Sequence, residues 1–285
     1  MPQLTWLVTG CTSGLGEVFI QRILARGDKA IATGKGNTNR LRALVDAGAR
    51  AYSLDVTASQ SDINGVVAKI MEENGDIDVL VNNAGYIEAG LAEETSIENY
   101  LAQFETNLFG VVKMTQAVLP HFRAKKAGTV VMIGSSGGIG GEPGAGPYCA
   151  TKFALEGWYD CLRQETAPLG IKNVIFELGF FRTKIMHPDN VKTFRSEHIS
   201  DYDDMRNLVA GFVQITNGSQ PGDPKKAVEI MLDVVKGEGV AEGRELPERL
   251  PLGPDVLKTM RKRCVNNLAI CNEWEDVIRS TNVEE

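Results

Sequence analysis

Short apolar runs alternate with longer amphipathic segments along the first two thirds of the chain. The apolar runs cover residues 4–9, 30–33, 51–54, 77–81 and 130–133, and a sixth ends near Leu178. Between the first two runs, Val18, Ile20 and Ile23 repeat with the period of a helix. This alternation predicts an α/β fold in which one doubly wound parallel sheet of about seven strands carries helices on both faces.

The remaining segments predict more helices and one more strand. Residues 96–124 form one long helical pattern, and residues 224–235 form another with Pro224 at its start. Residues 245–253 predict a short last strand and a turn, and residues 254–280 predict one or two helices. Because no linker or change of composition interrupts the chain, we expect one domain over residues 1–285, with a helical extension at 254–285.

Composition narrows the class of protein. Hydrophobic residues make up 43% and charged residues 24% of the 285 positions, which is typical of a soluble globular protein. The net charge of -7 argues against nucleic acid as the main partner. The sequence has no apolar stretch that could span a membrane, and residues 1–10 have no basic segment typical of a signal peptide. We therefore expect a cytoplasmic protein.

The cysteines support a cytoplasmic location, and the histidines bear on metal binding. The five cysteines form no C-x-x-C pair, so they predict free thiols in a reducing environment. The three histidines have no metal-ligand spacing, and we expect no metal site. Cys149 lies beside Tyr148 but has no histidine near it in sequence, so we interpret it as a packing residue.

The first strand leads into a glycine-rich turn and then into a helix. Gly10, Gly14 and Gly16 have the spacing G-x-x-x-G-x-G. Glycines at such a turn let the backbone approach a pyrophosphate, and the N-terminus of the following helix offers N–H donors and a positive dipole end. The turn therefore predicts a dinucleotide site.

The end of the second strand indicates which dinucleotide. An NAD site favours an acidic residue there, but Gly34 and Lys35 follow the strand instead, with Arg40 further on. Lys35 could contact a 2′-phosphate, or it could be a solvated loop residue. This pattern favours NADP(H) over NAD(H). Asp55, at the end of the third strand, could contact the adenine or cap the helix that begins near Ser59.

Residues 133–152 carry the candidate chemistry. Tyr148 and Lys152 are four residues apart, so they share one face of a helix. A lysine ammonium there is expected to lower the pKa of the phenol, which makes tyrosine usable as a general acid. Ser135 ends the fifth apolar run, where its hydroxyl could bind a substrate carbonyl. The simpler interpretation of Tyr148 and Lys152 is a solvated helix pair.

Two polar features lie upstream. Residues 82–85 read N-N-A-G at the end of a strand, where doubly wound sheets bind ligands. Asn107 lies within an apolar helical segment, which predicts a satisfied core hydrogen bond or a water-binding role.

The chain resembles the short-chain dehydrogenase/reductase family over about residues 4–185. The resemblance rests on the order of the glycine turn, Asp55, the N-N-A-G motif, Asn107, Ser135, Tyr148 and Lys152. The resemblance implies a Rossmann-type fold, Tyr148 as general acid or base, and Lys152 as the residue that lowers its pKa and holds the nicotinamide ribose. It also implies that Ser135 orients the carbonyl and Asn107 holds a water of the proton relay. The implied cofactor contacts are Gly10, Thr12, Ser13, Gly14, Leu15, Gly16, Lys35, Asp55, Val56, Asn83, Ala84, Gly85, Tyr148, Lys152, Gly179, Phe181 and Thr183.

One position departs from the family pattern. Leu178 stands before Gly179 where the family usually has proline, and the loss of that proline is expected to loosen the loop that follows. The resemblance further implies that residues 184–222 form a lid over the site. Large apolar residues in this segment, such as Phe194 and Phe212, predict a lipophilic or aromatic substrate, or they form only the apolar face of one or two helices.

The C-terminal length resembles the branch that includes hydroxysteroid and retinol dehydrogenases. A longer tail could cover the substrate pocket or change a subunit interface, so the chain could form a dimer or a tetramer. The expected partner is a small carbonyl or alcohol, and an NADPH preference favours ketone reduction.

Two other functions compete with this interpretation. Residues 134–138 fit the G-x-S-x-G pattern of a serine hydrolase with Ser136 at its centre, but a long glycine- and proline-containing loop follows instead of a helix. The candidate bases, His187 and His198, lack a convincing acid partner. A non-catalytic dinucleotide-binding protein, such as a redox sensor or scaffold, would have no need of the four polar residues from Asn107 to Lys152.

Overall fold

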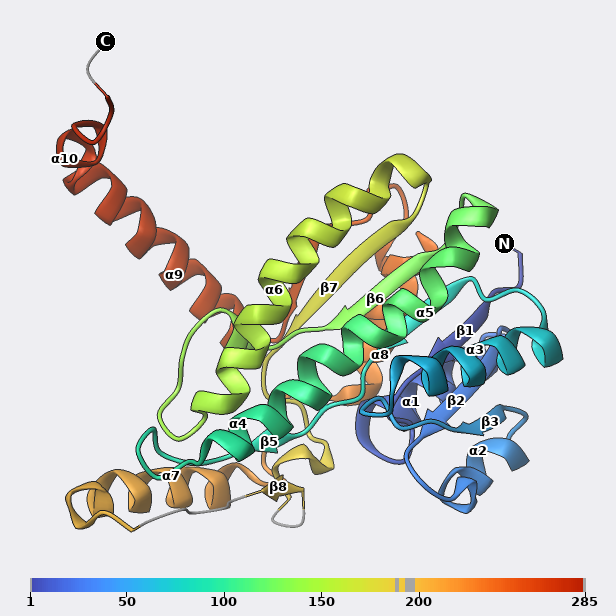
Figure 1. The fold of residues 1–285 in the computed structure, drawn as a ribbon, viewed down its shortest axis with the longest axis horizontal. Coiled ribbons are helices and arrows are strands. Elements are labelled where there is room, and N and C mark those ends of the chain that lie inside the picture. The colour runs from blue at the N-terminus through green and yellow to red at the C-terminus, as the bar shows by residue number, and fades with distance from the viewer. Residues whose placement is uncertain (1, 188–189, 193–197, 284–285) are drawn as a thin grey trace.

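A computed structural model describes residues 2–187, 190–192 and 198–283 of the chain. Its centre is a parallel sheet with the strand order β3-β2-β1-β4-β6-β7-β9. Figure 1 shows this sheet with β1, β2 and β3 toward one end and β6 and β7 toward the other. Its strands are β1 (Thr5–Val8), β2 (Lys29–Gly34), β3 (Arg50–Ser53), β4 (Val79–Asn82), β6 (Thr129–Ile133), β7 (Lys172–Leu178) and β9 (Arg249–Leu252). The predicted α/β fold with seven parallel strands is confirmed.

Alternate residues of each strand point to opposite faces of the sheet. In β1, Trp6 and Val8 belong to one buried cluster, whereas Leu7 belongs to the other. The same alternation separates Ile31 and Leu80 from their neighbours in β2 and β4. Because both faces are covered, the strands of this sheet are almost continuously apolar, which is why the sequence displays them as short hydrophobic runs.

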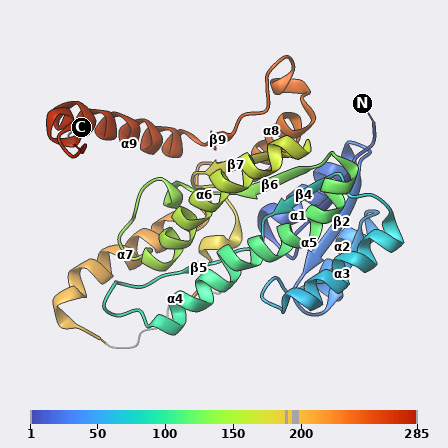
Figure 2. The ribbon, with the colours of Figure 1, turned by 45° about the horizontal axis from the view of Figure 1, so that its top comes forward.

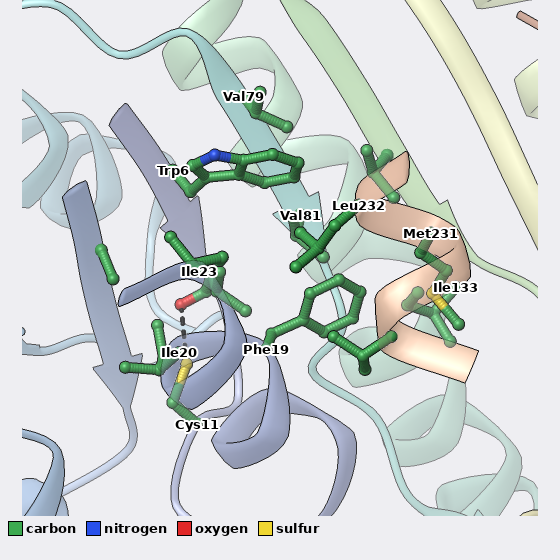
Figure 3. Packing of buried hydrophobic residues seen from close by; sticks show 14 of the residues in the cluster. Trp6, Cys11, Phe19, Ile20, Ile23, Val79, Val81, Ile133, Met231 and Leu232 are labelled. Carbon is green, nitrogen blue, oxygen red and sulfur yellow. Dashed lines mark hydrogen bonds between the residues drawn. The ribbon is translucent and has the colours of Figure 1, made fainter. Parts of the chain in front are cut away.

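Three helices cover the first face. They are α1 (Gly14–Ala25), α2 (Arg42–Asp46) and α8 (Pro224–Lys236). Figure 3 shows Phe19 and Ile23 of α1 packed beside Trp6 of β1, with Met231 and Leu232 of α8 completing the layer. The α1–α8 contact therefore joins the beginning of the chain to a segment more than 200 residues later.

Three longer helical segments cover the second face. They are α3 (Gln60–Asn74), the run of α4 (Ile97–Phe104) and α5 (Gly110–Lys125), and α6 (Gly146–Thr166). The run predicted over residues 96–124 is one helical path, interrupted by a π-helical turn at Glu105–Phe109. Serine caps begin two of these segments, because Ser59 accepts from the N–H of Asp62 and Ser96 accepts from that of Asn99.

Smaller elements complete the structure. A second, two-stranded sheet pairs β5 (Ile87–Glu88) with β8 (Val191–Lys192). Beyond it, α7 (Asp203–Thr216) lies in the segment predicted as a lid, whereas Phe194, named there as a lid residue, lies outside the described residues. At the C-terminal end, α9 (Pro254–Glu273) and α10 (Glu275–Arg279) project away from the sheet (Figure 2).

Within the described ranges, no helix has both the length and the apolar character to cross a membrane. Nor does that part of the chain hold three or more histidine, cysteine or acidic side chains placed to share a metal ion.

Candidate active site

A cavity of about 540 Å³ opens along the carboxyl ends of the strands. It spans the switch point between β1 and β4, where the strand order reverses and where sheets of this kind bind ligands. Of the catalytic residues and cofactor contacts that the family resemblance implies, only Gly16 is missing from the lining of this cavity. Residues from nine separate stretches of the chain, between Gly10 and Thr183, are therefore brought to a single cleft.

The glycine turn has the geometry that a dinucleotide requires. Gly10 and Gly14 have φ values of +71° and +63°, and a Cβ on Gly10 would lie 2.8 Å from the Cα of Ala84. A Cβ on Gly16 would collide with the backbone oxygen of Gly10. Only glycine fits these positions without strain, and the resulting turn leaves the N-terminus of α1 facing the cleft.

A lysine–aspartate pair lines the cleft beyond the ends of β2 and β3. The Nζ atom of Lys35 lies 2.8 Å from Oδ2 of Asp55. Burial alone would raise the pKa of Asp55, but hydrogen bonds from Lys35 and Thr57 outweigh it and lower that pKa. Asp55 accepts from the N–H of Thr57, so it caps the turn before α3 while it also lines the cleft. Asp55 does not cap α3, because Ser59 is its N-cap, and the adenine contact stays a prediction.

Ser135, Tyr148 and Lys152 converge at the middle of the cleft. Ser135 leaves the end of β6, and its hydroxyl hydrogen-bonds the phenol of Tyr148. Tyr148 and Lys152 lie one turn apart on α6, with the ammonium 5.8 Å from the centre of the phenol ring. Lys152 is buried and donates to the backbone oxygen of Ile133 at 2.7 Å. They are not a solvated helix pair.

The expectation of a lowered tyrosine pKa is wrong for this structure. Burial raises the pKa of Tyr148 to about 12, although the hydrogen bond from Ser135 opposes that rise. Burial also lowers the pKa of Lys152 to about 8, because desolvation disfavours its charged form more than Glu156 stabilises it. At neutral pH the phenol therefore carries its proton and can donate it.

Asn107 is held in place by the π-helical turn. Its Oδ1 accepts from the N–H of Tyr86 at 3.1 Å, and its Nδ2 donates to the oxygen of the same residue at 3.0 Å. Both groups of one peptide backbone are thereby satisfied, which fixes the loop between β4 and β5 against the helix. The extra residue of a π turn re-aims a side chain, and such turns are frequent at functional sites. Asn107 thus has the satisfied core hydrogen bonds that were expected, at the edge of the cleft.

The loop after β7 is fastened from the C-terminal part of the chain. The N–H of Phe180 donates to Oδ2 of Asp255 at 2.7 Å, and the N–H of Gly179 donates to the oxygen of Leu252 at 3.0 Å. A Cβ on Gly179 would overlap the carboxylate of Asp255. These contacts anchor the start of the loop where the family's proline is missing, and the expected loosening stays a prediction.

The opposite half of the cleft is mainly apolar. Phe180 and Phe212 meet edge to face with ring centres 5.7 Å apart, and Val209 of α7 lines the same wall. On its other side, α7 is anchored by Arg206, whose guanidinium pairs with the buried carboxylate of Glu94. The segment predicted as a lid therefore contributes apolar side chains to the cleft.

Two polar side chains in this half were not singled out from the sequence. Glu142 stands at the exposed rim of the cleft. Gln220 lines the cleft with 1% of its surface exposed, and both polar atoms of its amide are buried without a hydrogen-bond partner among the described residues. Gln220 lies in an irregular connection outside every recognisable motif, so only the fold reveals its position.

The geometry does not support a serine hydrolase. Ser136 lines the cleft, but it begins a short 3-10 turn instead of a helix. Among the described residues that line the cleft there is no histidine. His198 contacts Asp203 at the exposed surface, 2.9 Å away, and is not part of that lining.

The chain is similar to known proteins over most of its length. The model of the short chain dehydrogenase family matches residues 5–193. An oxidoreductase of Botryotinia fuckeliana, BOA17, is 32% identical over 275 residues, which are 95% of this chain and 97% of that protein. A 3-ketodihydrosphingosine reductase from Bacteroides thetaiotaomicron is 35% identical over 225 residues, 77% of this chain and 80% of the relative. A solved short-chain dehydrogenase from Streptomyces avermitilis has a TM-score of 0.86 at 36% identity, covering 99% of this chain and 100% of its own.

Proposed function

The chain belongs to the short-chain dehydrogenase/reductase family of oxidoreductases, and we propose that it uses NADP(H) to interconvert a ketone and an alcohol on a lipophilic or aromatic small molecule. The observation that carries this proposal is the meeting of Ser135, Tyr148 and Lys152 in the same cleft as the glycine turn. When bound there, the nicotinamide supplies or accepts the hydride.

The protein's own residues handle the proton and the orientation of the substrate. In the reducing direction, the phenol of Tyr148 donates its proton to the carbonyl oxygen, and a pKa of about 12 keeps that proton available at neutral pH. Ser135 holds the carbonyl through its hydroxyl. Lys152, which already donates to the Ile133 oxygen, is close enough to stabilise the phenolate that remains. Asn107 fixes the backbone of Tyr86 and supports a water in the relay that restores the proton.

The choice of NADP(H) rests on the end of β2. The strand ends at Gly34, and the lysine that follows lines the cleft together with Arg40. Two cations and no acid at this position favour a 2′-phosphate over free ribose hydroxyls. Asp55 holds Lys35 at the rim, so the ammonium is already placed before a phosphate arrives.

The substrate class rests on the apolar wall made by Phe180, Phe212 and Val209. One relative is named as a 3-ketodihydrosphingosine reductase, which supports a ketone as the group that is reduced. A carbonyl at the centre of the cleft and an apolar remainder against the α7 wall would suit the same arrangement. Reduction is the favoured direction with NADPH.

The cofactor is tested by titrating the purified protein with NADPH and NADH and following fluorescence. We expect NADPH to bind more tightly, and Lys35→Ala to weaken NADPH by roughly tenfold or more while leaving NADH nearly unchanged. Lys29→Ala is the matched control, because Lys29 is exposed at the opposite end of the same strand. Equal weakening of both cofactors by Lys35→Ala would place the phosphate contact elsewhere.

Catalysis is tested with a panel of apolar ketones and the Tyr148→Phe variant. Because the ring stays and only the hydroxyl that carries the proton is lost, we expect unchanged NADPH binding and a fall in turnover of roughly 10² or more. Tyr86→Phe, which removes a hydroxyl from the same cleft, is expected to keep most of the activity. A Tyr148→Phe variant that reduces ketones as fast as the parent contradicts the proposed role.

A further inference from the structure

Helix α9 leaves the body of the protein and is covered by no other part of the described chain. Figures 1 and 2 both show it projecting from the body of the protein, and Figure 2 shows that it follows β9. Every residue from 261 to 283 is exposed. Contacts hold only its beginning, where Asp255 binds the Phe180 N–H and the guanidinium of Arg263 lies 5.6 Å from the ring of Phe153.

The exposed part of α9 carries an apolar stripe. Leu257, Met260, Cys264, Leu268 and Cys271 follow one another at spacings of 3, 4, 4 and 3 residues. These spacings follow the 3.6-residue helical period, and they place the five side chains along one face of the helix. Leu268 is 62% exposed, and Trp274, just past the stripe, is 52% exposed. Most helices in proteins owe their stability to the packing of an apolar face, so the exposed stripe indicates a partner.

The charges beside the stripe indicate what that partner is. Lys258 and Arg261 lie near the beginning of α9, whereas Glu275 and Asp276 belong to α10, just past the far end of α9, where Glu275 also pairs with Arg279 at 2.8 Å. In a parallel pair of α9 helices, like charges would face each other. In an antiparallel pair, the basic end of each helix meets the acidic end of the other. The surface is therefore complementary to itself.

We propose that α9 forms an antiparallel pair with α9 of a second copy of this chain. The charges fix the register. Matching Lys258 to Asp276 and Arg261 to Glu275 places the two-fold axis between Asn267 and Leu268, within the exposed stripe. The same register sets Cys264 of each chain opposite Cys271 of the other, because both lie on the apolar face at equal distances from that axis. An isologous contact of this kind closes as a dimer.

Cysteine trapping tests both the pairing and its direction. All variants carry Cys161→Ser, because Cys161 is also an exposed free thiol. Copper phenanthroline with dissolved oxygen is added as the oxidant, and each disulfide forms as two thiols lose two hydrogens to oxygen. We expect covalent dimers from the parent, and none from Cys264→Ser or Cys271→Ser alone. Mixing these two variants restores the dimer, since each then supplies the thiol that the other lacks.

A charge in the stripe provides an independent test. We expect Leu268→Glu to reduce the cross-linking yield about tenfold or more, because the contact would bury an unpaired carboxylate. Ile270→Glu is the matched control, since Ile270 is similarly exposed at 56% but lies on another face of the same helix. Equal yields from the two variants overturn the proposal. Cross-linking of Cys271→Ser with itself would mean a parallel pair, and a monomer in sedimentation, with or without binding to lipid vesicles, would also overturn it.

Discussion

Gln220 is a buried amide whose two polar atoms have no partner in the described part of the protein. Leaving such groups unpaired costs roughly 1 to 3 kcal/mol. Sequences that break a local rule of this kind commonly do so at functional sites. Gln220 lines the cleft, where a ligand could supply the missing hydrogen bonds. We therefore interpret it as a contact for a polar group of the bound substrate or cofactor.

The variant Gln220→Met separates the cost of the unpaired amide to stability from its contribution to ligand binding. Methionine has a similar length and no strong donor or acceptor, so we expect the free energy of unfolding to rise by about 1 kcal/mol. We expect KM for the substrate or the Kd for NADPH to rise severalfold in the same variant. Thermal unfolding and steady-state kinetics measure the two. Gln214→Met, on the exposed side of α7, is the control and should change neither. A destabilised variant with unchanged KM and Kd would assign Gln220 a purely structural role.

At the scale of elements, α9 and the loop after β7 act together. Asp255 lies in the first turn of α9, and its carboxylate binds the N–H of Phe180. Gly179 leaves room for that carboxylate because it has no Cβ. The C-terminal helix thereby positions the backbone that leads to Phe181 and Thr183, two of the proposed cofactor contacts.

We expect Asp255→Ala to lower kcat/KM about tenfold, because the loop loses its anchor and the nicotinamide end of the site loses its alignment. Asp255→Asn keeps an oxygen that can accept from the Phe180 N–H, so it should restore most of the activity. Steady-state kinetics with NADPH and a ketone substrate check both. If Asp255→Asn and Asp255→Ala lower kcat/KM equally, the activity depends on the negative charge of Asp255 or on the fold, and the hydrogen bond to the Phe180 N–H is not the cause.

The strands and the principal helices could be predicted from the sequence, but other elements could not. Continuous apolar runs identify buried parallel strands, and a period of 3.6 identifies the helices that cover them. The β5–β8 pair is only two residues long in each strand, so no period develops. The π turn at Asn107 adds one residue to an otherwise regular pattern. Asp255 and Gln220 were missed because their roles depend on neighbours distant in sequence.

The same limit applies to the pKa values at the site. The spacing of Tyr148 and Lys152 correctly places them one turn apart. From that spacing alone, a lowered pKa of the phenol was expected. The spacing carries no information on burial, which proves to be the larger effect on both groups. A pair predicted from sequence can therefore be right in position and wrong in the direction of its titration.

At the scale of the whole molecule, buried charge is gathered at one edge of the sheet. Arg249 of β9 lies 3.1 Å from Glu156 and 2.6 Å from Asp160, both on α6. Glu177 of β7 is only 2% exposed and lies 3.7 Å from the same guanidinium. One cation thus serves three carboxylates where β7, β9 and α6 meet.

Glu177 makes the stability of the fold depend on pH. Burial raises its pKa from 4.5 to about 7, the nearby Glu156 adds to that rise, and Arg249 opposes it. Between these two values the folded protein binds a proton that the unfolded chain has lost. The contribution of Glu177 to stability therefore falls as the pH rises from 4.5 to 7, and the full penalty of the buried charge remains above pH 7.

Replacing Glu177 with glutamine should remove that penalty. We expect Glu177→Gln to raise the free energy of unfolding by about 1 to 3 kcal/mol at pH 8 and to change it little at pH 4.5, where the parent residue is already protonated in the folded state. Denaturant unfolding at several pH values measures the difference. Glu165→Gln, on the exposed side of α6, is the control and should show no such pH dependence. A Glu177→Gln variant that is less stable than the parent at pH 8 would mean that Arg249 needs this charge, and that the ion pair outweighs the cost of burying it.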